Sequence, residues 1–194
     1  MELSDYEKAS WEQLENASHD PEAPFRYLTV CSVDQNLQPQ ARTMVLRAVL
    51  ERSRELEFHT DIRSPKWEEL QQNQRATVLG YCPESRLQLR LQGTVTLHAP
   101  GTKQAQSAWS KLSHWTRQTY AGGPPGDELA FEPAQVTSIS SEGADRSEGQ
   151  IYFGILTFRA TSLDRFQLQR QNNQRMLFQY NSSGSLASEN WVNP

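Results

Sequence analysis

Runs in which apolar and polar residues alternate dominate this chain, and such runs are typical of β-strands with one buried face. They occupy residues 25–33, 41–50, 56–61, 75–82, 86–98, 152–158, 161–168 and 176–180. In the longest run Gly93 interrupts the alternation, which indicates a β-bulge or a close approach of another backbone. In the run 41–50, one face is expected to carry Met44, Leu46, Ala48 and Leu50. About seven strands without regular βαβ alternation predict a mainly β fold, a small β-barrel with helical decorations.

Residues 4–17 have the signals of an N-terminal helix. Ser4 and Glu7 have the spacing of a capping box at its start. The apolar positions recur at near-helical intervals and would pack on a core; they are Tyr6, Trp11 and Leu14.

Three further segments lie between the strands. Ser64 followed by Pro65 is a favoured pair at a helix start, and residues 102–120 are expected to form another helix. Residues 121–150 contain a Gly-Pro cluster and many acidic residues, and they are expected to form a long, partly mobile excursion. With no internal repeat and no linker, we expect one domain over residues 1–194.

Composition narrows the class of protein. Acidic residues outnumber basic ones by 23 to 19, and the net charge of -4 argues against a general nucleic-acid binder. Cys31 and Cys82, without a C-x-x-C motif, make neither a metal site nor a disulfide framework, which fits a reducing cytoplasm. The sequence contains no run of 18 apolar residues, so we expect no membrane span. The acidic first residues do not resemble a secretory signal.

No metal or nucleophile motif is recognisable. The four histidines stand apart in the sequence, without H-x-x-x-H or H-E-x-x-H spacing; they are His19, His59, His98 and His114. G-x-S-x-G, G-x-G-x-x-G and the P-loop motif do not occur. We therefore expect no metal site, and we assign no catalytic residue.

Anion binding has a clearer signal. Arginine outnumbers lysine by 15 to 4, and arginine is suited to bidentate recognition of phosphate or carboxylate. Arg42 lies in one predicted strand, and Arg63-Ser64-Pro65-Lys66 lies at a predicted helix start, where free N–H groups attract anions. On local pattern alone this is either a phosphate site or a helix capped by Ser64 whose flanking cations face water.

Three short motifs occur in a set order along the chain. They are Arg42-Thr43-Met44-Val45-Leu46-Arg47; Phe58-His59-Thr60-Asp61 followed by Ser64-Pro65-Lys66; and Arg86-Leu87-Gln88 leading to Gly93. Together with the ending Trp191 to Pro194, they resemble the pyridoxamine 5'-phosphate oxidase-like flavoproteins, which bind FMN in a split β-barrel. The likeness covers residues 25–98 well and residues 151–194 loosely.

The resemblance implies an FMN site. Arg42, Ser64 and Lys66 would hold the phosphate, Arg47 would lie near the flavin and the substrate, and Gln88 would bond the polar edge of the ring. Arg175 would come from the second subunit. The cofactor-binding residues implied in this way are Arg42, Thr43, Met44, Val45, Leu46, Arg47, His59, Thr60, Arg63, Ser64, Lys66, Gln88 and Arg175.

The substrate residues of that family are not matched. Gln171 and Asn173 stand where the family has Arg and His. Trp109, Ser113 and Arg117 replace the Tyr, Arg and Ser of its substrate-phosphate helix. The pattern therefore favours a cytoplasmic, homodimeric FMN-dependent oxidoreductase, related to that oxidase, in which flavin N5 accepts a hydride from an unidentified small substrate. The alternative is a non-enzymatic split-barrel module that binds flavin or haem, and a third possibility is a split barrel without a cofactor.

Overall fold

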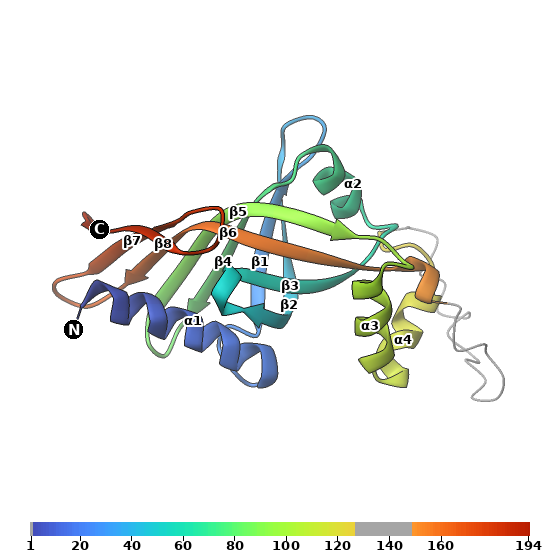
Figure 1. Ribbon diagram of the computed structural model, residues 1–194, viewed down its shortest axis with the longest axis horizontal. Helices are drawn as coiled ribbons and strands as arrows, with labels where there is room; N and C mark the ends of the chain where they lie inside the picture. Colours follow the sequence, from blue (N-terminus) through green and yellow to red (C-terminus); the bar gives the residue numbers. More distant parts are fainter. Residues whose placement is uncertain (1, 127–148) are drawn as a thin grey trace.

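Six antiparallel strands form a closed barrel in the computed structural model, which describes residues 2–126 and 149–194 (Figure 1). In spatial order they are β3 (Glu55–Asp61), β2 (Pro39–Leu50), β1 (Tyr27–Val33), β4 (Arg75–Cys82), β5 (Leu87–His98) and β6 (Phe153–Gln167). The pairing of β3 with β6 closes the barrel. Two further strands extend the sheet beyond β6, namely β7 (Gln174–Tyr180) and β8 (Leu186–Val192). The mainly β fold predicted from the alternation is therefore confirmed.

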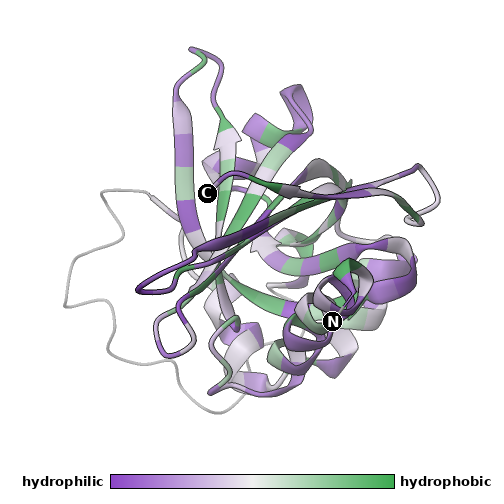
Figure 2. Cartoon of the chain, turned by 90° about the vertical axis from the view of Figure 1, so that its left-hand side faces the viewer, coloured by the Kyte–Doolittle hydropathy of each residue, from purple (hydrophilic) through white to green (hydrophobic). Residues whose placement is uncertain are grey.

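Helices cover the ends of this sheet. In the described residues they are α1 (Leu3–His19), α2 (Pro65–Gln72), α3 (Lys103–Lys111), α4 (His114–Ala121) and the short 3-10 helices η1 (Glu51–Ser53) and η4 (Gln150–Tyr152). Figure 1 shows α1 below the extended part of the sheet, α2 above the barrel and the pair α3 and α4 at the opposite end from β7 and β8. Apolar residues concentrate along the strands, and polar residues mark the hairpin tips (Figure 2).

The strands differ from the sequence pattern at the C-terminal end. The runs 152–158 and 161–168 form one strand, β6, of 15 residues. Strand β8 is not predicted by the pattern, because none of its residues is fully buried and no alternation marks a core face. It is held instead by its antiparallel pairing with β7.

Arg47 lies in a β-bulge of β2, where the pairing with β3 shifts register between Leu46 and Ala48. The expected alternation holds up to Leu46. Beyond it the expectation is wrong, because Leu50 is 47% exposed and Val49 packs against the core instead. One extra residue in a strand reverses the faces of all residues that follow.

Helix α1 confirms the N-terminal prediction, although it begins differently. The capping box is formed by Glu2 and Asp5, not by Ser4 and Glu7. Glu7 is instead turned inward, with 5% of its surface exposed. The capping box therefore lies two residues earlier in the chain than the spacing of Ser4 and Glu7 predicts.

A buried chain of hydrogen bonds fixes α1 to β7. The indole N–H of Trp11 donates to the Tyr180 hydroxyl at 2.8 Å, and this hydroxyl donates to the Glu7 carboxylate at 2.8 Å. Arg54 forms an ion pair with Glu7 at 3.0 Å and lies over the rings of Trp11 and Tyr180. Burial raises the pKa of Glu7 and of Tyr180. The Trp11 indole, the Tyr180 hydroxyl and the Glu7 carboxylate each have a hydrogen-bond partner, which offsets the cost of removing them from water.

Residues 102–120 form the two helices α3 and α4, so the expectation of one helix is wrong. The Ser113 side chain accepts a hydrogen bond from the backbone N–H of Thr116 and so caps a new helix. Arg117 joins the two helices by donating to the carbonyls of Trp109 and Ser110, at 3.2 and 2.8 Å.

Gly93 fulfils both structural reasons expected for a glycine in this strand. The register of β5 against β6 shifts between Gln92 and Gly93. A Cβ atom on Gly93 would lie 2.0 Å from the carbonyl oxygen of Arg159. Any other residue at this position would push the two strands apart.

Most of the expected excursion over residues 121–150 lies outside the described residues. Within the described part of the chain, no helix combines the length and hydropathy needed to cross a membrane.

Candidate functional site

The barrel wall opens between β2 and β3. Among the described residues, β2 pairs with β3 only from Leu46 opposite Phe58 onward, whereas β3 continues along β6 as far as Asp61 opposite Phe153. The first half of β2 pairs with β1 alone. Its other edge therefore presents unpaired backbone groups beside the end of β3. The expected site residues on this edge are Arg42, Thr43, Met44 and Val45.

Side chains on this edge alternate between core and surface. Met44 and Leu46 are buried in the barrel core, at 7% and 0% exposure. Their side chains are therefore not available to a ligand outside the barrel. Thr43 is exposed and Val45 is half-buried on the outer face.

Helix α2 is packed against the end of this opening. Trp67 is 7% exposed and lies against β6 at Gly154, where a Cβ atom would come within 2.6 Å of the indole ring. Leu70, one turn further on, is fully buried. The N-terminus of α2 is thereby held at the end of β3.

In the described part of the chain, the N-cap residue of α2 makes no side-chain capping hydrogen bond. Ser64 occupies the N-cap position, but its hydroxyl donates to the carbonyl of Asp61 at 2.6 Å. Pro65 occupies the first helical position and has no N–H. An uncapped N-terminus with its positive dipole end favours an anion, so the simple capping alternative for Ser64 is not what the geometry shows.

Lys66 points toward this helix start. Its ammonium donates to Thr60 Oγ1 at 3.2 Å, and Thr60 Oγ1 lies 3.4 Å from Ser64 Oγ. Burial lowers the pKa of Lys66, and the nearby Arg42 guanidinium lowers it further. A cation that is partly buried close to a second cation is stabilised by any anion that binds beside it.

Arg42 is held in place by a buried carboxylate. It donates to Glu69 Oε2 of α2 at 2.8 Å and to the hydroxyl of Ser32, which itself donates to Glu69. Glu69 and Ser32 are 8% and 2% exposed. The Arg42 guanidinium is therefore fixed near Lys66 by a partner on α2.

Arg63 is directed elsewhere. It forms a bidentate pair with Asp61, with atoms 2.6 to 3.2 Å apart. It also donates to the carbonyls of Tyr120 and Gly122 and stacks on Tyr152, 3.6 Å from the ring centroid. These contacts connect the turn before α2 to the end of α4. Arg63 therefore stabilises the structure around the site.

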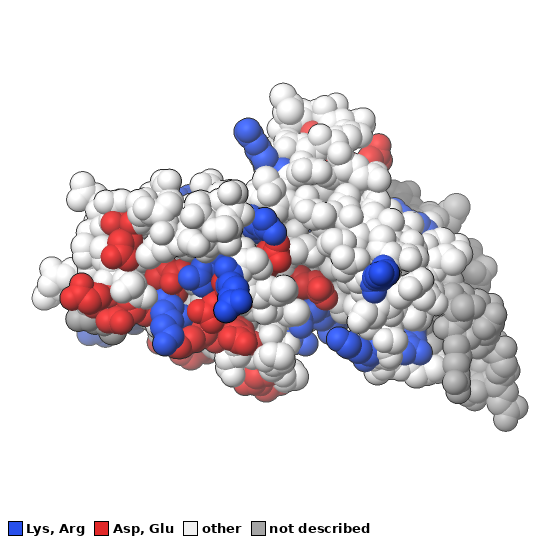
Figure 3. Space-filling view, viewed as in Figure 1, with Lys and Arg blue, Asp and Glu red and all other residues white. Residues whose placement is uncertain are grey.

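Arg47 lines a cleft of about 660 Å³ between β2, β3 and α3. Burial lowers the pKa of Arg47, and the charge of Arg26 lowers it further. The Arg47 Nε atom is buried without a partner among the described residues. The charged side chains that line the cleft are Arg26, Arg47, Glu57, Lys103 and Lys111. Figure 3 shows basic residues gathered around α3, while acidic residues lie mainly on the side of α1.

His59 also faces this cleft, because it points to the opposite side of β3 from Thr60. Its Nε2 atom lies 3.2 Å from Glu57, and its ring packs edge-on against Phe153. The Nδ1 atom is buried with no partner in residues 2–126 and 149–194. Thr60 thus lies beside Lys66 at the start of α2, whereas His59 lies in the same cleft as Arg47.

The residues at the unmatched helix positions have structural contacts. Trp109 is buried against Phe153, Ser113 caps α4, and Arg117 bonds carbonyls of α3. None of the three lines the cleft. Tyr120 packs on Phe153 as well, and burial raises its pKa to about 12, although the charge of Arg47 opposes this rise.

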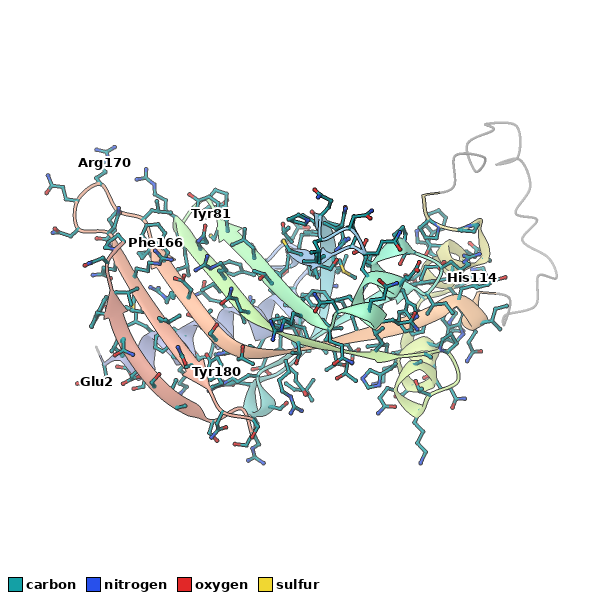
Figure 4. All side chains as sticks on the ribbon, turned by 90° about the horizontal axis from the view of Figure 1, so that it is seen from above. Glu2, Tyr81, His114, Phe166, Arg170 and Tyr180 are labelled. Atoms are coloured by element: carbon teal, nitrogen blue, oxygen red, sulfur yellow. The ribbon has the colours of Figure 1, made fainter. Side chains whose placement is uncertain are left out.

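Gln88 and Arg175 lie in a second place, at the other end of the sheet. Both are paired in register with Phe166 of β6, and Figure 4 shows Phe166 far from His114 and close to Tyr81. Thr60, in contrast, is paired with Gly154. Gly154 and Phe166 are twelve residues apart, about 40 Å of strand at 3.3 Å per residue. The structure therefore brings the expected site residues together in two separate groups.

Several charged residues in the cleft and beside the site arginines do not belong to any of the sequence motifs. Lys103 and Lys111 are eight residues apart and share a helix face with Ser107, a spacing that could have indicated them. Glu69 and Asp164 become recognisable only through packing, because their arginine partners are distant in sequence.

Comparisons with known proteins agree with this geometry. A family model described as "Pyridoxamine 5'-phosphate oxidase, FMN-binding domain" matches residues 8–99. Pyridoxine/pyridoxamine 5'-phosphate oxidase 2 of Arabidopsis thaliana is 27% identical over 189 residues, 91% of each chain. Pyridoxine/pyridoxamine 5'-phosphate oxidase of Paraburkholderia phymatum is 32% identical over 95 residues, 47% of this chain and 44% of that protein.

Solved structures show the same fold. A pyridoxamine 5'-phosphate oxidase-related, FMN-binding protein of Nostoc punctiforme has a TM-score of 0.75 and 27% identity, with 96% of each chain covered. PhzG of Burkholderia lata, crystallised with tetrahydrophenazine-1-carboxylic acid, has a TM-score of 0.67 at 16% identity, over 87% of this chain and 82% of that one. The fold is thus the FMN-binding split barrel. Residues 8–99 thus match the FMN-binding domain of the pyridoxamine 5'-phosphate oxidase family, and the chain is similar to proteins of this family over most of its length.

The burial of Lys66 gives a test in the ligand-free protein. Because the folded state lowers the pKa of Lys66 below its ordinary 10.5, the charged form opposes folding, and stability gained by losing the proton appears as the pH rises toward 10.5. Lys66→Met should therefore be more stable than the wild type at pH 7, by about 1 kcal/mol, and the difference should shrink as the pH rises.

Urea unfolding at several pH values measures this difference. Lys8→Met is the matched control, since Lys8 is 69% exposed on α1. A Lys66→Met protein that is less stable at pH 7, or whose difference from the wild type is constant with pH, contradicts the assignment.

Proposed function

We propose that this chain is a cytoplasmic, homodimeric FMN-dependent oxidoreductase, with residues 1–194 forming one FMN-binding domain. The observation that carries the proposal is the pair of cations, Arg42 and Lys66, beside the uncapped N-terminus of α2 in a chain whose residues 8–99 match an FMN-binding domain. Because Cys31 and Cys82 are free thiols, the protein suits a reducing compartment.

The donor set at the opening suits a phosphate monoester. Arg42 and Lys66 supply charge, Thr60 and Ser64 supply hydroxyl groups, and α2 supplies its free N-terminus. We name this set, Arg42, Thr60, Ser64, Lys66 and the α2 N-terminus, the phosphate cradle. Its side chains are already fixed by Glu69 and by their mutual hydrogen bonds, so binding would order few further groups.

The flavin ring would then lie along the open edge of β2. There the backbone groups of Thr43 and Val45 face away from β1 and can bond the polar atoms of a ring. His59 and Arg47 border the adjoining cleft. FMN, when bound, supplies hydride acceptance at its N5 atom.

Arg47 would tune this chemistry electrostatically. Its guanidinium is half-buried and has no carboxylate partner in the described part of the chain, so its charge is weakly screened. A positive charge near the ring stabilises electron density that is added to it. The cleft between Arg47 and α3 is the place where a small substrate would approach the flavin.

The homodimer is inferred from the separation of the two groups of site residues. Within one chain, about 40 Å of the β6 strand separates the position paired with Thr60 from the position paired with Gln88 and Arg175. A two-fold symmetric pair would bring Gln88 and Arg175 of one chain to the cradle of the other. The outer sheet face also exposes Tyr27 and Tyr81, at 60% and 48%, as expected for an interface.

The alternative, a non-enzymatic split-barrel module that binds flavin or haem, is favoured by the substrate positions. Gln171 and Asn173 lie in the exposed turn between β6 and β7, and Asn173 accepts a hydrogen bond from the Gln169 backbone. Ser113 and Arg117 are used within α3 and α4. Such a module would hold FMN that no small-molecule donor reduces.

The phosphate cradle predicts different effects on FMN and on riboflavin, which lacks the phosphate. Arg42→Gln and Lys66→Met should each weaken FMN binding about tenfold to a hundredfold, since each removes a charge-assisted contact of about 1.5–3 kcal/mol. Riboflavin binding should change less than threefold. Fluorescence titration of both flavins measures this, with Lys8→Met as the unaffected control. Equal losses for FMN and riboflavin would mean that the residues do not bind the phosphate.

The proposed dimer predicts that assembly and FMN binding are lost together. Tyr81→Glu places a charge on the outer sheet face and should give a monomer whose FMN affinity is at least tenfold weaker. Leu37→Glu, in the turn between β1 and β2 and 79% exposed, should remain dimeric. Light scattering with and without FMN measures both. A monomeric variant with full FMN affinity excludes a flavin site shared between subunits.

The position of Arg47 predicts the redox behaviour of the bound cofactor. Arg47→Met should make the two-electron reduction potential of bound FMN more negative by about 30 mV, equivalent to about 1.4 kcal/mol, while Arg47→Lys should largely preserve it. Anaerobic dye titration gives the potential, and bleaching of the flavin by a panel of reduced donors tests the oxidoreductase itself. An unchanged reduction potential would show that Arg47 does not lie near the flavin. Bound FMN that none of the donors reduces would support the alternative, a non-enzymatic module.

A further inference from the structure

A buried carboxylate joins two arginines on the outer face of the sheet. Asp164 of β6 accepts from Arg175 of β7 through both oxygens, at 3.0 and 2.8 Å, and from Arg90 of β5 at 2.6 Å. The Asp164 side chain is 6% exposed, while those of Arg90 and Arg175 are 42% and 31% exposed. We name Arg90, Asp164 and Arg175 the arginine clamp.

Strand register fixes the geometry of the arginine clamp. Arg90 is paired with Asp164, and Arg175 is paired with Phe166, two residues along the same face of β6. The Arg175 guanidinium also lies 5.8 Å from the centroid of the Phe166 ring. Burial alone would raise the pKa of Asp164, but hydrogen bonds from Arg175 and the charges of both arginines hold it below its ordinary range. The carboxylate therefore stays charged near pH 7 and keeps the two guanidinium groups side by side.

The arginine clamp differs from an ion pair that serves packing alone. In the pair of Arg54 with Glu7, both side chains are buried, at 14% and 6% exposure, and tie α1 to the core. In the clamp one acid serves two bases, so one positive charge remains unbalanced on a surface that is partly open to solvent. Excess charge that is held in a fixed geometry at a surface is suited to bind an acceptor-rich or anionic group.

We propose that Asp164 is a positioning residue that aims Arg175, supported by Arg90, at the ring of the FMN held by the partner subunit. The inference rests on the proposed homodimeric FMN site. Gln88, Phe166 and Arg175 follow one another across three strands in a single row. The three side chains therefore address one part of a ligand, and we assign this part to the polar edge of the flavin, since the phosphate lies in the cradle of the other chain.

Asp164→Asn tests this role, because it keeps the shape of the side chain and removes its charge. Without the carboxylate the two guanidinium groups repel each other and separate. Affinity for FMN and for riboflavin should fall by a similar factor, about tenfold, since both flavins have the same ring. A loss confined to FMN would place the contact at the phosphate and overturn the ring assignment.

A double-mutant cycle separates positioning from a general structural effect. If Asp164 acts through Arg175, Asp164→Asn in an Arg175→Gln background should change flavin affinity less than twofold. Equal losses in both backgrounds would show that Asp164 does not act through Arg175 and would overturn the proposal. If Asp164→Asn does not fold, Arg175→Lys gives a second test, because it keeps the positive charge and loses the bidentate geometry. It should weaken the binding of FMN and of riboflavin by a similar factor. Unchanged binding would overturn the proposal.

Glu7→Gln is the matched control, since it alters a buried ion pair of α1 outside both groups of site residues. It should change the free energy of unfolding and leave flavin affinity unchanged. Wild-type protein that binds no FMN would overturn the proposed function and the arginine clamp with it. Wild-type protein that binds FMN while Asp164→Asn binds it equally well would overturn the clamp alone.

Discussion

The candidate site depends on how β3 pairs with its two neighbouring strands, β6 and β2. Strand β3 follows β6 over its whole length, from Glu55 to Asp61, but leaves β2 beyond Phe58. Beyond Phe58 the other edge of β3 has no partner in β2, so the first half of β2 stays uncovered on this side. The exposed edge of β2, the seat of α2 at Gly154 and the meeting of Lys66 with Thr60 all follow from this divergence.

Around the opening, buried acids fix the arginines, whereas Lys66 forms no ion pair with the residues that the structure describes. Glu69 fixes Arg42, and Asp61 fixes Arg63, so neither arginine pays the full cost of leaving water. Among the described residues Lys66 has only the hydroxyl of Thr60, and its charge is correspondingly unfavourable in the folded protein. The chain thus accepts a loss of stability at the place where an anion would restore it, a compromise that is common in binding sites.

Much of the fold and part of the site follow from local sequence. The alternation of apolar residues predicts most strands, and the motif order places Arg42, Ser64 and Lys66 near one another. The period of two along β3 also separates His59 from Thr60. Local patterns fail where packing decides: the bulge at Arg47 reverses the faces of β2. Ser113 divides an apparently continuous helix, and the two site groups separate only once the length of β6 is known. Glu69 and Asp164 have no local signal, because Arg42 lies 27 residues from Glu69, and Arg90 and Arg175 lie 74 and 11 residues from Asp164.

The hydrogen bond between Trp11 and Tyr180 has a consequence for the order of folding. Its two residues are 169 positions apart, so almost the whole chain must be synthesised before this contact can form. Helix α1 leaves the ribosome well before β7, so it can pack against β2 while Trp11 still lacks its hydrogen-bond partner. Contacts of such long range slow folding, because the chain must close a large loop before the contact stabilises it. The Trp11 indole and the Glu7 carboxylate therefore lack their Tyr180 partner until β7 is synthesised, the period in which assistance by chaperones would matter most.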